Sequence, residues 1–161
     1  MDANFTAEEH FRRGEEDLAE GRRDLALEHF RAAHRLDPMS PRYRSHFGLV
    51  LGLVERRLDR ALELCRSAAR EEFFQPAHYH NLARLHLAFG FKAEAIRYLR
   101  RGLMIDPDNE AIGAALRSMG VRRRPPLMFL RRQNFLNRWL GRLTGRNAGV
   151  APELELTPFS V

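Results

Sequence analysis

The chain has 161 residues, of which 44% are hydrophobic and 30% charged, a size and balance typical of one soluble domain with a real core. Its single cysteine, Cys65, excludes an intramolecular disulfide framework, and its longest apolar run, Phe47 to Val54, is far shorter than the roughly 20 residues of a membrane-spanning helix. Because the acidic, broken N-terminus does not resemble a secretory signal peptide, we expect a cytoplasmic protein.

One pattern recurs along the chain with a period of 34 to 35 residues. Similar segments begin at Ala26, Ala61 and Ala95, and the first and third of them end on Asp-Pro, at Pro38 and Pro107. A period of this length indicates stacked helical repeats, in which no unit can bury its apolar face alone.

Each repeat predicts two helices. In the first, Phe11, Gly14 and Leu18 fall at helical spacing, Gly21 breaks the pattern, and a second apolar stripe runs to Asp37. The same pattern predicts helix pairs over residues 6–36, 41–72 and 76–105, with no sheet. Residues 109–119 predict one further helix, which caps the last pair.

Small residues recur at matching places in these helices. They are Gly14, Gly48 and Ala83 on the first helices and Ala26, Ala61 and Ala95 on the second. A larger side chain would hold the helices apart, so we expect these positions to mark helix crossings. Cys65 occupies the place of Phe30 and Leu99, which predicts a small core residue.

The C-terminal part of the chain differs in charge. Residues 1–110 carry 18 Lys and Arg against 19 Asp and Glu, whereas residues 111–152 carry nine Arg and no acid. Within residues 121–146, an apolar stripe with Trp139 stands against arginines, which predicts a basic amphipathic tail. We expect residues 147–161 to be flexible.

Over Thr6 to Asp108 the chain resembles the tetratricopeptide repeat (TPR) proteins, helix-turn-helix arrays of 34-residue units. The resemblance implies an all-α, right-handed α-solenoid with repeats at 6–38, 41–75 and 76–108, a cap at 109–119, and an array that ends near residue 120. It departs from the family pattern at His10 and Arg44, where an aromatic residue is expected.

The resemblance also implies a non-catalytic scaffold that binds a peptide or helix in a concave groove lined by the first helices. We expect the partner to be a protein segment with acidic and apolar residues. The groove candidates, taken from their places in each first helix, are Glu8, Phe11, Arg12, Glu15, Arg42, Ser45, Leu49, Ala77, His80, Asn81 and Arg84.

Two narrower roles follow from the family. Members that grip the C-terminal carboxylate of chaperone partners place Lys and Asn where this chain has Phe11 and Glu15, so that role is disfavoured. Three repeats in a chain of this length also resemble the chaperones of type III secretion translocators, and chaperoning a secreted client is therefore an alternative function.

Catalysis, metal binding and cofactor binding have no visible apparatus in the sequence. His78 and His80 are two residues apart on a predicted helix and point to different sides, without a second ligand pair at helical spacing. There is no glycine-rich phosphate loop and no serine elbow. We therefore expect neither an enzyme nor a metal or cofactor site.

The basic tail has three physical uses: docking on the array, lying on an anionic membrane surface as a peripheral adaptor, or binding an acidic partner. Nucleic acid is the least favoured partner, because the array itself is near neutral and the tail has few aromatic residues. The candidate contact residues are Arg131, Arg132, Arg138, Trp139 and Arg142.

Overall fold

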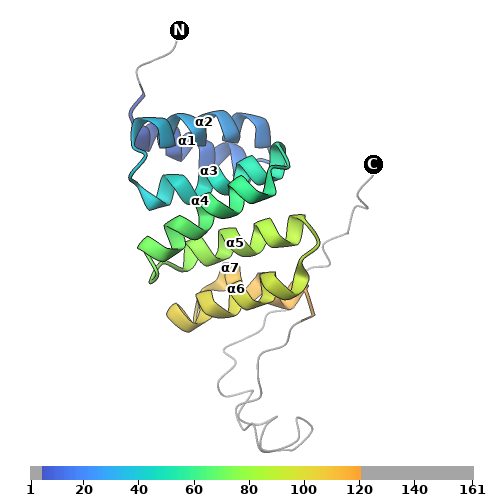
Figure 1. Cartoon of the computed structure of the whole chain (residues 1–161). Helices are drawn as coiled ribbons and strands as arrows, with labels where there is room; N and C mark the ends of the chain where they lie inside the picture. Colours follow the sequence, from blue (N-terminus) through green and yellow to red (C-terminus); the bar gives the residue numbers. More distant parts are fainter. Residues whose placement is uncertain (1–4, 121–161) are drawn as a thin grey trace, which may run out of the picture. The chain divides into compact units, whose positions relative to one another are not determined.

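The computed structural model describes residues 5–120, and every regular element in this part of the chain is an α-helix. The helices are α1 (Ala7–Ala19), α2 (Arg23–Leu36), α3 (Pro41–Val54), α4 (Leu58–Glu71), α5 (Pro76–Ala88), α6 (Lys92–Ile105) and α7 (Glu110–Ser118). They pack as the pairs α1–α2, α3–α4 and α5–α6, which follow one another in a stack (Figure 1). The predicted all-α, helix-turn-helix architecture is confirmed.

Local sequence signals set the helix ends. Thr6 and Glu9 form a complete capping box at α1, and the side chains of Ser40 and Asn109 cap α3 and α7. The turns inside the first and third pairs contain Gly21 and Gly90 with φ of +79° and +82°, a conformation that glycine adopts without strain. Gly21 is the break predicted within the first repeat, and Gly90 is its counterpart in the third.

The turn inside the middle pair is as long as the other two but contains no glycine, and the extra residue of this repeat lies in α3, which has 14 residues against 13 in α1 and α5. Arg56 adopts φ of +57° there without being glycine. Its guanidinium lies 4.1 Å from the centre of the Phe89 ring and donates a hydrogen bond of 3.2 Å to the carbonyl of Ala88. Contacts with the next repeat therefore stabilise a backbone conformation that costs a non-glycine residue about 1 kcal/mol.

The small residues lie where the helices cross. The alanines at 26, 61, 83 and 95 have no exposed surface. A Cβ atom on Gly14 would lie 2.8 Å from the Phe30 ring, and one on Gly48 would lie 2.9 Å from the Cβ of Leu64. Each glycine therefore permits a close approach between the two helices of its pair.

The last of the described helices, α7, covers the end of the stack. Its Ile112 and Leu116 are buried against Ala95 and Leu99 of α6, together with Ala83 of α5. This is the capping role predicted for residues 109–119. None of the described helices is both long enough and apolar enough to cross a membrane.

Candidate functional site

The candidate binding surface is formed by side chains of the first helices, α1, α3 and α5. We call it the first-helix face and define it by residues Glu8, Arg12, Glu15, Arg42, His46, His80 and Arg84. Contacts between α3 and α5, and between side chains of α1 and α3, join the three helices along this surface. Its residues include a self-paired cluster around Arg42 and a second group around Arg84.

Arg42 is the centre of the self-paired cluster. Its guanidinium nitrogens lie 3.2 Å from Glu8 and 3.6 Å from Glu15, and its guanidinium carbon lies 3.9 Å from the centre of the Phe11 ring. The hydroxyl of Tyr43 donates a hydrogen bond of 2.8 Å to Glu8. Burial, together with this bond, raises the pKa of Tyr43 to about 12. The charge of Arg42 is therefore balanced within the chain.

Four of the predicted groove residues lie in the core instead of on the surface. Phe11, Ser45 and Leu49 have no exposed surface, and Asn81 is only 3% exposed. The apolar contact expected from Phe11 and Leu49 is thus not available to a partner. The reason is that a first helix is covered on two sides, by its own second helix and by the neighbouring first helix.

Ser45 and Asn81 form a polar link inside this core. The side-chain amide of Asn81 donates a hydrogen bond of 3.2 Å to the hydroxyl of Ser45. The thiol of Cys65 donates one of 3.3 Å to the Ser45 carbonyl, and burial raises its pKa to about 12. These residues connect α3, α4 and α5. Cys65 is a buried thiol at neutral pH, as predicted for a core residue.

His46 is a partly buried residue of the first-helix face that sequence reasoning missed. Its ring packs edge-on against Phe11 at 4.8 Å, and its Nδ1 lies 2.9 Å from the Arg42 carbonyl. Burial lowers its pKa to about 4, so the ring is uncharged at neutral pH. The repeat register was the available signal, because His46 occupies the same place in its helix as Arg12 and Asn81 do in theirs.

Arg84 differs from Arg42 because no carboxylate within residues 5–120 balances it. Its side chain is half-buried, and burial together with the charge of Arg23 lowers its pKa. Among the residues that the structure describes, neither Arg84 nor Arg23 forms an ion pair. The pKa of neighbouring His80 is lowered by burial and by the Arg84 charge. This part of the face is therefore cationic, with no counter-charge from the described part of the chain.

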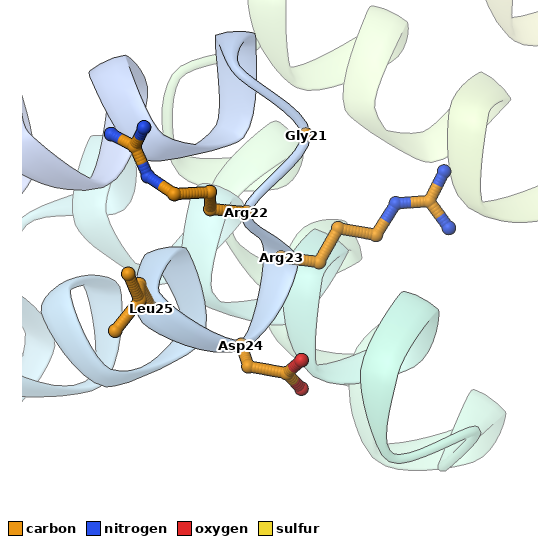
Figure 2. Close-up of a pocket in the computed structure, with 5 residues that line it drawn as sticks. All are labelled: Gly21, Arg22, Arg23, Asp24 and Leu25. Atoms are coloured by element: carbon orange, nitrogen blue, oxygen red, sulfur yellow. The ribbon is translucent and has the colours of Figure 1, made fainter.

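The turn before α2 determines where Arg23 points. Arg22 is held by Asp17, with a hydrogen bond of 2.8 Å and a further contact of 2.7 Å. Figure 2 shows that Arg22 and Arg23 extend to opposite sides of the turn. Arg23 thus points away from the Arg22–Asp17 pair, and its charge acts on Arg84.

The remaining predicted residues are not brought into a common catalytic or metal site. His78 is buried, and its Nε2 lies 2.9 Å from Glu72, whereas His80 belongs to the first-helix face. Residues 5–120 contain no group of three His, Cys, Asp or Glu side chains placed to hold a metal ion. Arg12 and Ala77 are exposed. The tail residues Arg131, Arg132, Arg138, Trp139 and Arg142 lie outside the described residues.

Comparison with solved structures gives similar folds at low sequence identity. The first TPR of Spaghetti (RPAP3) bound to an HSP90 peptide has a TM-score of 0.57 and 18% identity, over 71% of this chain and 93% of that one. YrrB, a TPR protein with an unusual peptide-binding site, has a TM-score of 0.57 and 19% identity, over 70% of this chain and 58% of that one.

A third similar structure is PcrH in complex with the chaperone binding region of PopB. It has a TM-score of 0.55 and 22% identity, over 73% of this chain and 96% of that one. No protein-family model matches the chain, and its sequence has no match among curated proteins. The helix order, the close crossings and these similarities define the fold: the chain is a TPR-type α-solenoid.

Proposed function

We propose that this chain is a non-catalytic interaction scaffold, and that its first-helix face binds a protein segment rich in acidic residues. The observation that carries the proposal is the uncompensated charge of Arg84 beside Arg23. A half-buried guanidinium without a carboxylate has lost part of its hydration and gained no ion pair. A carboxylate from a partner would supply that pair, and arginine binds carboxylates in a bidentate geometry.

The two histidines beside Arg84 add no positive charge of their own to this surface. His46 and His80 have lowered pKa values because they are buried near arginines, so both rings are neutral at neutral pH. The single N–H of His46 faces the Arg42 carbonyl, whereas His80 can donate a hydrogen bond to a partner. Leu87, one turn after Arg84 on α5, is 37% exposed. It offers an apolar contact in place of the buried Phe11 and Leu49.

The similar structures support the peptide-binding part of the proposal. Two of their descriptions name a bound peptide or a bound segment of another protein, an HSP90 peptide and a region of PopB. The manner of binding proposed for this chain is different from a grip on a C-terminal carboxylate. Of the two places where that grip requires Lys and Asn, one holds the buried Phe11 and the other holds Glu15, which pairs with Arg42.

A displayed library of random peptides, balanced in acidic and basic residues, tests the proposal. The full chain should select peptides with acidic residues beside an apolar one. Arg84→Gln should weaken binding of the selected peptides by about tenfold or more, the loss of one charge-assisted contact. The matched control is Arg97→Gln, which removes an exposed charge from α6. Selection without an acidic preference, or equal losses in both variants, would refute the proposal.

A second candidate, chaperoning of a secreted client, is favoured by one observation: the likeness to PcrH bound to PopB extends over nearly the whole of PcrH. The two candidate functions predict different solubility of the partner when it is expressed without this chain. A partner that stays soluble without this chain indicates a scaffold, whereas one that aggregates unless both are co-expressed indicates a chaperone.

A further inference from the structure

A cleft of about 330 Å³ lies on a different surface, between the second helices α4 and α6. Arg66 and Arg70 of α4 and Arg101 of α6 line it, together with Tyr98, and Tyr79 of α5 forms part of its floor. Phe73, which follows α4, completes the lining and is 65% exposed. The cleft is thus bordered by three arginines and three aromatic rings.

The equivalent space between α2 and α4, which we call the first junction, is filled by side chains of this chain. There Arg31, the counterpart of Arg66, pairs with Glu55, and Arg44 pairs with Glu71. His34 stacks on Phe47 at 5.3 Å between ring centres. Two arginines are therefore paired, and the space between the helices is filled, within the chain at that junction.

The second junction, between α4 and α6, lacks these acidic and aromatic side chains. Ala69 stands in place of His34, Ile105 stands in place of Glu71, and the turn after α5, Phe89-Gly90-Phe91, has no acid. Among residues 5–120, the three cleft arginines form no ion pair. The acids nearest to Arg66 and Arg70 in the sequence pair elsewhere: Glu63 with Arg60, Glu71 with Arg44, and Glu72 with His78. The space left by the smaller residue is therefore open and cationic.

The unpaired arginines and the exposed aromatic rings of the cleft are both unfavourable without a bound partner. Arg66 and Arg70 are four residues apart on one helix, where like charges destabilise the helix. Phe73 and Phe74, the latter 57% exposed, lie edge to face at 5.8 Å beside the cleft and add apolar surface. A ligand that neutralises the arginines and covers the rings would relieve both features.

We propose that this cleft is a second docking surface, which binds an acidic peptide segment with an apolar side chain between its carboxylates. The carboxylates pair with Arg66, Arg70 and Arg101, and the apolar side chain lies between Phe73 and Tyr98. The Arg101 guanidinium already lies 5.1 Å from the centre of the Tyr79 ring, which holds it over the floor of the cleft. This site is independent of the first-helix face.

Fluorescence anisotropy of the full chain with a labelled ten-residue peptide, in which glutamates flank Leu and Phe, tests this proposal. The parent should bind it, and the same peptide with Gln for Glu should bind at least about tenfold more weakly. Arg66→Gln with Arg70→Gln should cause a similar loss. The control, Arg97→Gln with Arg100→Gln, removes the same charge outside the cleft and should change the affinity less than about twofold.

Two further variants test whether the peptide occupies the cleft itself. Ala69→His copies the first junction, so it should block the peptide without changing the formal charge at neutral pH. All of these variants are also compared in an Arg84→Gln background, which removes the contribution of the first-helix face; the loss in the cleft pair and the block by Ala69→His should persist there, whether or not the proposed function holds. The proposal is overturned if the parent does not bind, if the control pair loses as much as the cleft pair, or if single-stranded RNA or anionic vesicles bind the cleft arginines in preference to the peptide.

Discussion

Replacing Gly48 with alanine should destabilise the array, although alanine is the better helix former. A Cβ atom at this position would lie 2.9 Å from Leu64 Cβ, 2.9 Å from the Cys65 sulfur and 3.0 Å from the Ala61 carbonyl oxygen. Two of these neighbours, the Cβ and the carbonyl, move only if the helix moves. Overpacking of this kind costs about 1 to 3 kcal/mol.

Gly113 in α7 supplies the matched control. A Cβ atom there would meet only the end of the flexible Arg117 side chain, at 3.2 Å. Both substitutions gain about 1 kcal/mol of helix propensity, so the difference between them isolates the cost of the crossing. We expect Gly48→Ala to be less stable than Gly113→Ala by about 1 to 3 kcal/mol, or roughly 4 to 12 °C in Tm. Equal melting temperatures by circular dichroism would refute the close crossing of α3 and α4.

Three more predictions concern buried groups. Ser45→Ala leaves the amide of Asn81 without its partner and should cost about 1 to 3 kcal/mol in urea unfolding, whereas Ser67→Ala, whose hydroxyl bonds only within its own helix, should cost less. The pKa of His46 is about 4 in the folded chain against an ordinary 6.5, so its stabilising contribution is complete above pH 6.5 and is lost as the pH falls toward 4. His46→Gln should therefore flatten the fall in stability on acidification, by up to about 1.4 kcal/mol per pH unit, and an unchanged slope would contradict the burial of this ring. Because burial raises the pKa of Cys65 to about 12, its reaction with a disulfide reagent should wait for unfolding and accelerate with denaturant; rapid labelling of the native chain would show that the thiol is accessible.

The fold could be predicted from sequence because its signals are local and repeated. The apolar spacing, the breaks at Gly21 and Gly90 and the small residues all recur with the same period, and each is decided within one or two turns of helix. The observed pairs, at residues 7–36, 41–71 and 76–105, accordingly lie within about one residue of the predicted ranges.

The surface was harder to predict because exposure depends on neighbouring repeats. Phe11 belongs to a first helix, yet Arg42 and His46 of the next repeat cover its ring. Whether an arginine forms an ion pair also depends on residues far from it in the sequence. Glu8 and Glu15 balance Arg42, while no described carboxylate reaches Arg84. Helix register identifies which side chains share a face, and only the packed structure identifies which of them remain accessible and uncompensated.

The first-helix face is tested most directly by locating a bound peptide on the array. A photo-reactive derivative of a library-selected acidic peptide, chosen for its dependence on Arg84, can be crosslinked to the full chain and the attachment sites read by mass spectrometry. We expect crosslinks to α1, α3 and α5, concentrated around His46, His80 and Leu87. Crosslinks confined to α2, α4 and α6 would contradict binding at the first-helix face.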